Sequence, residues 1–493
     1  SPVVIAGAAS LAIGLRHLAP GDLTPAPTPW LLRLPAEEDT APTYVERLSA
    51  FLFVLAPWLV VYEAVILVGA PADAIEGYFA FERSLPVIAP TEVVYASVYA
   101  GVLTAHVVAP TRSVLRAFAL RGLVSMAVIF PLFFFVPVVA PPRAFVPEDI
   151  FGHALAWERA VDTPNGAFPS FHVVWATLAG EVFAARWPRF RHLARLWAAA
   201  VSLACITTGM HALVDVLAGA LVALGLVHQD ALWERLRRMT ERVANSWHEW
   251  RIGPVRIISH GVWAGLAVGV GCAIAVGLAG PSQLKAIAIA AAASIVGAGL
   301  WAQLVEGSPE LLRPYGYYGG VLGIIVGSLA APLADGSTWL LLAAFSVAGP
   351  WTQSLGRMRC LVQGCCHGHE APAHIGIRYT HARSRVCRLA HLAGVPVHPT
   401  PLYSILWNAL LALVLARLWM TRAPLHLIAG LYLILTGVGR FPEEAFRGEP
   451  QTPGWLGLRL YQWIAITTVL VGAAVIAFAR SAPAPTPAPN VQA

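Results

Sequence analysis

Two short polar motifs contain the residue types that phosphoryl transfer needs. Residues 167–172 read Ala-Phe-Pro-Ser-Phe-His, and residues 211–215 read His-Ala-Leu-Val-Asp. His211 and Asp215 are four residues apart, so on a helix they would share a face, where the carboxylate could hold the imidazole in one tautomer. Such an imidazole can attack phosphorus. His172 could act as general acid and base, since the ordinary pKa of histidine is about 6.5.

Two further residues could hold the phosphate. Ser170 follows Pro169 at an expected helix start, where unpaired backbone amides point toward an anion. Arg143, in the run Pro-Pro-Arg, offers a forked cation for phosphate oxygens. Because both histidine motifs open long apolar segments, the expected substrate is a lipid.

A second set of motifs lies between residues 315 and 447. Arg357, Arg440 and Arg447 adjoin apolar segments, where a charge is costly beside lipid, so they are expected to line a polar cavity. A cavity of this kind suits an anionic lipid headgroup. The surrounding motifs are Tyr-Gly-Tyr-Tyr-Gly-Gly at 315–320, Gln-Gly-Cys-Cys-His-Gly at 363–368 and His-Pro-Thr-Pro-Leu-Tyr at 398–403.

The elements that position these motifs are predicted to be membrane helices. The 493 residues are 57% hydrophobic and 12% charged, whereas a soluble domain has about 25% charged residues. Apolar runs of spanning length recur without the alternation of barrel strands, which predicts an all-α polytopic fold with two membrane modules. The net charge of +6 is not concentrated in a basic domain with interleaved aromatics, so nucleic-acid binding is not predicted.

Composition also divides the chain. Residues 1–229 form the first predicted module, with apolar runs near 3–19, 48–70, 92–110, 120–140, 168–186, 195–210 and 211–228. The run at 3–19 has no basic segment before it, so it is expected to be a short membrane helix rather than a signal peptide. Residues 230–256 are predicted to be a basic amphipathic linker on anionic lipid, 257–480 the second module, and 481–493 a disordered Pro/Ala-rich tail.

Arginine-rich loops predict the orientation of the first module. The groups at 112–121, 186–195 and 235–256 fall on one side of alternating helices, which the positive-inside rule places in the cytoplasm. The loop 141–165 and the turn before His211 then face outward. For the second module, simple alternation leaves the loop 357–391 in the cytoplasm.

The first set of motifs resembles the type-2 phosphatidic acid phosphatase (PAP2) family, over about residues 45–228. Val-Ala-Pro-Pro-Arg-Ala-Phe, Phe-Pro-Ser-Phe-His and His-Ala-Leu-Val-Asp are similar to its three motif blocks, closest to the branch of inositol phosphorylceramide synthase-like phosphotransferases. The resemblance implies a six-helix core, with His211 as nucleophile, Asp215 as its partner and His172 as acid and base. It implies Arg143 and Ser170 as phosphate contacts.

Two positions depart from the common PAP2 pattern. Val136 stands where a lysine is usual, and Cys205 stands where an arginine is usual. Cations supply much of the stabilisation in phosphoryl transfer. Three interpretations stay open: Arg159 or another loop cation replaces them, the headgroup geometry differs, or the site is degenerate. A further interpretation is that the histidines are ordinary interfacial residues.

The second set of motifs resembles prolipoprotein diacylglyceryl transferase, over about residues 300–479. That enzyme moves a diacylglyceryl group from phosphatidylglycerol to a cysteine of a lipoprotein precursor and releases glycerol phosphate. The resemblance implies chemistry reached from the outer leaflet, in conflict with simple alternation. Tyr318, Cys360 and Thr436 stand where the family usually has histidine, asparagine and tyrosine. By motif position we expect Arg357 and Arg440 to be catalytic, and the substrate to contact Tyr318, Gly319, Gly320, Gly368, His398, Tyr403, Glu444 and Arg447.

Cysteines and histidines gather between residues 360 and 391. Zinc would need four converging nitrogen or sulfur ligands, and paired Cys-x-x-Cys spacing is missing from this stretch. The sequence therefore predicts no metal and no cofactor. A metal site and redox-active thiols remain alternatives to plain polar loop residues.

Together these features favour a bifunctional lipid enzyme of a bacterial inner membrane, with the PAP2-like site facing the periplasm. Its expected partners are phospholipid substrates, the bilayer and a lipoprotein precursor. The rear reaction would release a phosphorylated glycerol that the front half could dephosphorylate. The alternatives are that one half is catalytic and the other is a lipid-binding scaffold, or that the chain is a lipid transporter.

Overall fold

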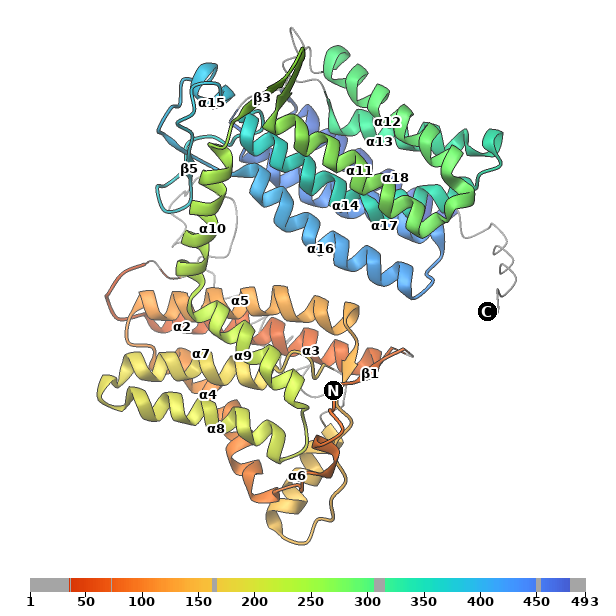
Figure 1. Cartoon of the computed structure of the whole chain (residues 1–493). Coiled ribbons are helices and arrows are strands. Elements are labelled where there is room, and N and C mark those ends of the chain that lie inside the picture. The colour runs from red at the N-terminus through yellow and green to blue at the C-terminus, as the bar shows by residue number, and fades with distance from the viewer. Residues whose placement is uncertain are drawn as a thin grey trace. The chain divides into compact units, whose positions relative to one another are not determined.

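A computed structural model describes residues 35, 37–71, 73–161, 166–305, 315–448 and 454–478. The predicted helix at 3–19 and the predicted tail at 481–493 lie outside these residues. The chain divides into two compact units, Ser1–Leu232 and Trp233–Ala493, and Figure 1 shows each as a bundle of helices. The division falls inside the predicted linker 230–256. The prediction of an all-α polytopic fold is confirmed.

Apolar runs of the first unit form its helices. In chain order these are α2 (Tyr44–Ala50), a π-helical turn (Phe51–Leu55), α3 (Ala56–Val68), α4 (Glu92–Val108), α5 (Arg112–Phe135), α6 (Ile150–Val161), α7 (Phe171–Arg186), α8 (Arg191–Thr207) and α9 (Leu213–Val227). Side-chain caps fix two of the starts. Thr43 accepts from the amide of Glu46 in a reciprocal capping box, and Thr111 accepts from the amide of Val114. The short strands β1 (Ile75–Glu76) and β2 (Val138–Val139) pair in parallel.

Helix α7 is the centre of the first unit. It contacts α4, α5, α8 and α9, and nearly all of its first twelve residues are buried. The Phe171 ring meets Trp58 and Phe133 edge-on, with centroids 5.7 and 5.6 Å apart. Aromatic packing of this kind adds to the area that burial removes from water. Because His172 follows Phe171, this packing holds the start of the histidine helix in place.

The second unit combines helices of 19–26 residues with shorter ones. They are α10 (Gln229–Ala244), α11 (Ser259–Ala279), α12 (Leu284–Leu304), α13 (Tyr317–Leu329), α14 (Thr338–Gln363), α15 (Arg385–Arg388), α16 (Thr400–Met420), α17 (Leu425–Ala445) and α18 (Leu460–Phe478). Among the described residues, three antiparallel strand pairs accompany them: β3–β4 (Glu249–Ile252, Val255–Ile258), β5–β6 (Ile377–Arg378, Pro396–Val397) and β7–β8 (Gly454–Trp455, Leu458–Arg459).

Helices α12 and α13 approach each other backbone to backbone. A Cβ atom added to Gly319 would lie 2.2 Å from the carbonyl oxygen of Gly297, and one added to Gly323 would lie 2.2 Å from that of Ala293. Small residues permit such close contact between membrane helices, where dispersion drives association. Glycine is therefore required at these two positions by packing alone.

Eight of the described helical segments are long and apolar enough to cross a bilayer by length and composition. They are Tyr44–Val68, Ala89–Val108, Arg112–Phe135, Ser259–Ala279, Pro281–Leu304, Thr400–Met420, Leu425–Ala445 and Leu460–Ala477. The predicted spans at 168–186, 195–210 and 211–228 form helices of only 15–17 residues. They are shorter than the ~20 residues of a full crossing. Each begins or ends beside the histidine motifs.

Helix α10 is anchored to its own unit. The Trp233 indole donates to the His374 carbonyl oxygen at 3.0 Å, and Arg237 donates to that of Gly376 at 3.1 Å. The Asn245 amide donates to the Arg378 carbonyl oxygen and accepts from the Thr380 amide. One face of the predicted linker therefore packs on protein, and contact of its remaining surface with anionic lipid stays a prediction.

Candidate active sites

The first site brings together the two histidines and the aspartate. His211 Nε2 lies 3.4 Å from His172 Nδ1, and His211 Nδ1 lies 3.5 Å from Asp215 Oδ2. All three side chains are buried, and Asp215 is fully so. The Ser170 hydroxyl lies 3.5 Å from His211 Nε2. The His211 nitrogen that faces His172 is thus opposite the one beside the Asp215 carboxylate, which is the arrangement of a nucleophilic imidazole, although Nδ1 makes no hydrogen bond within the described residues.

The expectation that His211 lies on a helix with Asp215 is wrong. Helix α9 begins at Leu213, so His211 lies in the turn before it. The Asp215 carboxylate accepts from the Ala212 amide at 2.9 Å, which caps the helix and leaves the same carboxylate beside the imidazole. Ser170 is the residue before the first turn of α7, as expected, but its hydroxyl makes no bond to the helix amides.

Residues that the motifs did not indicate surround His172. The Tyr95 hydroxyl lies 3.3 Å from Nδ1, and the Tyr99 hydroxyl lies 3.2 Å from Nε2. Tyr99 in turn donates to Glu158 Oε1 at 2.6 Å. Tyr95 and Tyr99 are four residues apart on α4, a spacing that could have identified them as one polar face of an apolar helix.

Arginines of the first site hold the turn that carries His211. Arg143 Nη1 donates to the Glu82 carbonyl oxygen at 2.9 Å, and its Nη2 donates to that of Ile206. Arg159 donates to the carbonyl oxygens of Arg143 and Thr208, each at 2.6 Å. The Nε atoms of both arginines have no hydrogen-bond partner within the described residues. Arg143 and Arg159 therefore place two cations at this turn, and the Nε–H group of each could donate a hydrogen bond to a phosphate oxygen.

A half-buried tyrosine and a buried glutamate complete this turn. The Tyr78 hydroxyl donates to the Gly209 carbonyl oxygen at 3.1 Å, and burial raises the pKa of Tyr78 to about 12, so it remains a donor at neutral pH. Glu82 Oε1 accepts from the Leu213 amide at 2.6 Å. Gly209 has a φ of +68°, a conformation that favours glycine. Cys205, at the position of a usual PAP2 arginine, is fully buried and provides no cation.

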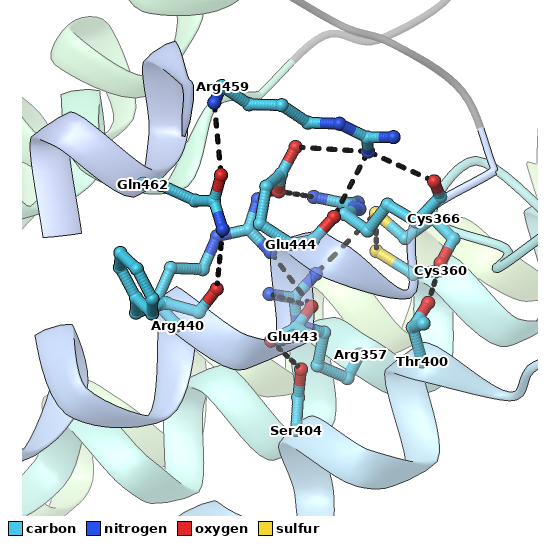
Figure 2. Close-up of polar contacts among 12 residues, drawn as sticks. Arg357, Cys360, Cys366, Thr400, Ser404, Arg440, Glu443, Glu444, Arg459 and Gln462 are labelled. Carbon is cyan, nitrogen blue, oxygen red and sulfur yellow. Dashed lines mark hydrogen bonds and ion pairs between the residues drawn. The ribbon is translucent and has the colours of Figure 1, made fainter. Parts of the chain in front are cut away.

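The second site is a buried network of arginines and glutamates (Figure 2). Glu443 lies 2.9 Å from Arg440 Nη1 and 3.4 Å from Arg357 Nη2. Glu444 pairs with Arg440 and lies 3.8 Å from Arg447 Nη1. Arg459 donates to the Glu444 carbonyl oxygen at 3.0 Å. Sequence reasoning missed Glu443, although its adjacency to Glu444 in a helix with Arg440 was a signal.

The charge of this network is unbalanced. Among the described residues it contains four arginines against two glutamates, which leaves an excess of two positive charges. Arg447 is buried, and its Nε and Nη2 have no hydrogen-bond partner within the described part of the chain. Buried guanidinium groups without partners are costly. The network can therefore bind an anion with two negative charges or two singly charged groups.

Several predicted substrate contacts lie beside this network. The Gly368 amide donates to the His398 carbonyl oxygen at 2.9 Å, and Gly368 also pairs with Arg447 in an isolated bridge. His398 Nδ1 lies 3.0 Å from the Tyr403 hydroxyl. Burial, and next the neighbouring His369, hold the pKa of His398 below its usual value. Their contact with a substrate stays a prediction.

The glycines of the 315–320 motif have a different setting. Gly319 packs on Gly297 and Trp301 of α12, and Gly320 packs near Ser294. Tyr318 is buried and stacks on Tyr461, with centroids 5.7 Å apart. The Arg440 guanidinium lies 5.0 Å from the centre of the same Tyr461 ring. Tyr318 thus reaches the arginine network through an aromatic neighbour.

Three cysteines converge at the end of α14. Cys366 Sγ lies 3.5 Å from Cys360 Sγ and 3.8 Å from Cys365 Sγ, and Arg357 Nη1 lies 3.5 Å from Cys366 Sγ. Gly364, with a φ of +73°, ends the helix and turns the chain back. Hydrogen bonding with Cys360 and Cys365, and then the charges of Arg447 and Arg357, hold the pKa of the Cys366 thiol well below its usual range.

Comparison with known proteins finds two families in the chain. A family model for the PAP2 superfamily matches residues 74–228, and one for prolipoprotein diacylglyceryl transferase matches residues 249–478. Relatives of the rear half are named phosphatidylglycerol–prolipoprotein diacylglyceryl transferase. The protein of Clostridium tetani is 29% identical over 175 residues, which cover 34% of this chain and 66% of the relative.

Two further relatives carry the same name. The transferase of Clostridium perfringens that is numbered 2 is 29% identical over 177 residues, 35% of this chain and 66% of the relative. That of Erythrobacter litoralis is 28% identical over 172 residues, 33% of this chain and 58% of the relative. The chain thus spans slightly less than two thirds of these relatives. It is a multi-pass bacterial membrane protein that fuses a module of the PAP2 superfamily with a module of the prolipoprotein diacylglyceryl transferase family.

Proposed function

We propose that the chain is a bifunctional lipid enzyme of the bacterial inner membrane. Its rear half transfers a diacylglyceryl group from a phosphatidylglycerol-like donor to the cysteine thiol of a lipoprotein precursor. Its front half cleaves or transfers a lipid phosphate through a phosphohistidine, at a site that faces the periplasm. The observation that carries the rear assignment is the excess of two positive charges around Glu443 and Glu444, where three buried arginines and the partly exposed Arg459 face two buried glutamates.

The rear chemistry follows from where that charge lies. Arg357 and Arg440 approach the same Glu443 carboxylate from two helices, so a phosphate that enters the network is held from both sides. As the bond between the glyceryl carbon and the phosphate oxygen breaks, negative charge builds on the leaving phosphate. The arginines stabilise that charge in a setting with little water. When no phosphate is bound, Glu443 and Glu444 compensate two of the four positive charges of the arginines.

The front chemistry uses both histidines. His211 Nε2 attacks phosphorus while Asp215 holds its Nδ1 proton, and His172 protonates the alkoxide that leaves. His172 then takes a proton from water or from an alcohol, which attacks the phosphohistidine. Tyr99 connects His172 to the buried Glu158 carboxylate, which could exchange a proton with the imidazole through the Tyr99 hydroxyl.

The two reactions could act in sequence. Glycerol phosphate released by the rear half is a phosphate monoester, which the front half could hydrolyse to glycerol and phosphate. The full chain in proteoliposomes, given phosphatidylglycerol and a lipoprotein-precursor peptide, should then form lipidated peptide and free glycerol. Release of glycerol phosphate without any glycerol would refute the coupling while leaving the transferase assignment intact.

Separate variants distinguish the two halves. With phosphatidic acid supplied directly as the front-half substrate, His211→Ala should abolish phosphate release and leave peptide lipidation unchanged, whereas Arg440→Ala should abolish lipidation and leave this phosphate release unchanged. Exposed residues of the same type provide controls, His192→Ala for the front half and Arg388→Ala for the rear half. The His211 role also predicts a trapped phosphoryl group on this residue when labelled phosphatidic acid or an inositol or glycerol phospholipid is supplied.

A second candidate is that the front half is a lipid-binding scaffold. The observation that favours it is the loss of two usual PAP2 cations at Val136 and Cys205. If His211→Ala changes no lipid product while Arg440→Ala abolishes transfer, the scaffold assignment replaces the phosphatase assignment. Arg159 argues for catalysis, since it brings a second cation to the turn that carries His211.

A further inference from the structure

The three cysteines at the end of α14 have the separation of metal ligands. Their sulfur atoms all lie within 4.8 Å of one another, and two of the separations are 3.5 and 3.8 Å. Zinc binds thiolate sulfur at about 2.3 Å, so two sulfurs of a tetrahedral site are about 3.8 Å apart. A disulfide would instead require about 2.05 Å. The arrangement is close to that of three sulfurs around one ion.

The turn at Gly364 is what creates this arrangement. Cys360 belongs to the last turn of α14, while Cys365 and Cys366 follow the left-handed glycine that ends the helix. The Gly364 amide donates to the Cys360 carbonyl oxygen at 2.8 Å, and the Thr400 hydroxyl donates to that of Cys366. The backbone carbonyl groups at both ends of the cysteine segment are thus hydrogen-bonded, so the ligand positions are set before any ion binds.

The surrounding charge fits a thiolate site. Three thiolates and one Zn²⁺ carry a net charge of −1, and a fourth thiolate makes it −2. Arg357 Nη1 lies 3.5 Å from Cys366 Sγ, and buried Arg447 has two guanidinium nitrogens without partners within the described residues. These cations would compensate the charge that remains on the sulfurs. The same arginines belong to the network assigned to the lipid phosphate.

We propose that Cys360, Cys365 and Cys366 bind one zinc ion whose fourth position receives the acceptor thiol of the transfer reaction. This inference rests on the proposed diacylglyceryl transfer. Catalytic zinc sites have three protein ligands and an open position for substrate, and a coordinated thiol loses its proton. The acceptor sulfur then attacks the glyceryl carbon, a sulfur–carbon bond forms, and the bond from that carbon to the phosphate oxygen breaks. The leaving glycerol phosphate keeps the electron pair of the broken bond, and the thiol proton passes to solvent.

Metal content of the purified full chain provides the first test. We expect one zinc ion per chain by elemental mass spectrometry, and substoichiometric zinc in Cys360→Ser and Cys366→Ser variants that elute and melt like the wild type. Cys272→Ser and Cys387→Ser, which alter cysteines outside the cluster, should keep the ion. Zinc that survives in Cys360→Ser, or a metal-free wild type with a Cys360–Cys366 disulfide, would overturn the inference.

Cobalt substitution tests the open position without any turnover. Co²⁺ bound by three thiolates gives sulfur-to-cobalt charge-transfer absorption, which should intensify when a cysteine peptide is added and stay unchanged with the matching serine peptide. No response to the cysteine peptide would refute thiol binding. If the spectra respond but no diacylglyceryl peptide forms, the proposed function fails and the site stands. If metal-free enzyme transfers at the wild-type rate, the function stands and the zinc inference fails.

Discussion

Replacing Glu443 by glutamine should make the empty rear unit less stable and make it bind phosphate more tightly. The wild-type carboxylate lies 2.9 Å from Arg440, 3.4 Å from Arg357 and 2.7 Å from the Ser404 hydroxyl, and it is 9% exposed. Removing one partner of a buried ion pair costs about 3–5 kcal/mol. Glutamine can still accept from Ser404, so we expect a cost near the lower limit, about 3 kcal/mol. At about 2–4 °C per kcal/mol, the thermal midpoint should fall by roughly 6–12 °C.

The same substitution raises the positive excess of the network from two charges to three. An anion should then recover part of the lost stability. A ligand that binds only the folded state stabilises it by RT ln(1 + [L]/Kd), so glycerol phosphate should raise the melting temperature of Glu443→Gln more than that of the wild type. Thermal unfolding of the detergent-solubilised chain at a series of glycerol phosphate concentrations measures both effects.

Exposed Glu370 provides the matched control, since Glu370→Gln should change stability by no more than about 0.5 kcal/mol. A Glu443→Gln protein as stable as the wild type would show that the arginines are compensated in another way. Loss of stability without a larger response to glycerol phosphate would show that the network holds the fold but does not bind phosphate.

Three further substitutions test the two sites. Asp215→Asn removes the carboxylate that orients His211 and should lower the rate of front-half phosphate release by about 10²-fold or more, measured as kcat with unchanged binding of substrate. Tyr99→Phe removes the hydroxyl between His172 and Glu158 and should lower the same rate by about 10-fold and alter its pH profile, whereas an unchanged profile would assign Tyr99 to packing alone. Gly368→Ala places a Cβ atom 2.4 Å from that of His398 and should destabilise the rear unit by about 1–3 kcal/mol in thermal unfolding, while Gly356→Ala, which has open space around it, should not.

Hydropathy and motif spacing predicted much of this molecule. Continuous apolar runs gave the helices because a lipid-exposed backbone must satisfy its hydrogen bonds internally. The histidine and arginine motifs indicated which helix ends carry charge. An ionisable group beside an apolar run is costly in a membrane, so its presence points to a functional site. The convergence of the histidine motifs follows from the fold: His172 lies in the first turn of α7 and His211 in the turn before α9, yet the two side chains lie together in the first unit.

Other features depend on contacts that spacing alone does not contain. Tyr99 contacts His172, and Glu158 contacts Tyr99, because α4 packs on α7 and α6 packs on α4. Neither residue belongs to a motif. The three thiols converge because the chain turns back at Gly364, which has a left-handed conformation. The irregular spacing of the cysteines in the sequence did not indicate this convergence. His211 lies outside its helix because the Asp215 carboxylate caps the next residue, a detail that four-residue spacing cannot reveal.

The anchoring of α10 determines where the two halves could be separated. Asn245 alone makes hydrogen bonds with Arg378, Thr380 and His381. Trp233 and Arg237 donate hydrogen bonds to carbonyl oxygens earlier in the same loop, those of His374 and Gly376. A break introduced after Val227 would keep this helix with the loop that it supports. A break after residue 256 would strip the loop of those bonds and leave polar backbone exposed next to the cysteine segment. Dissection of the fusion into two expressed polypeptides should therefore assign α10 to the transferase partner.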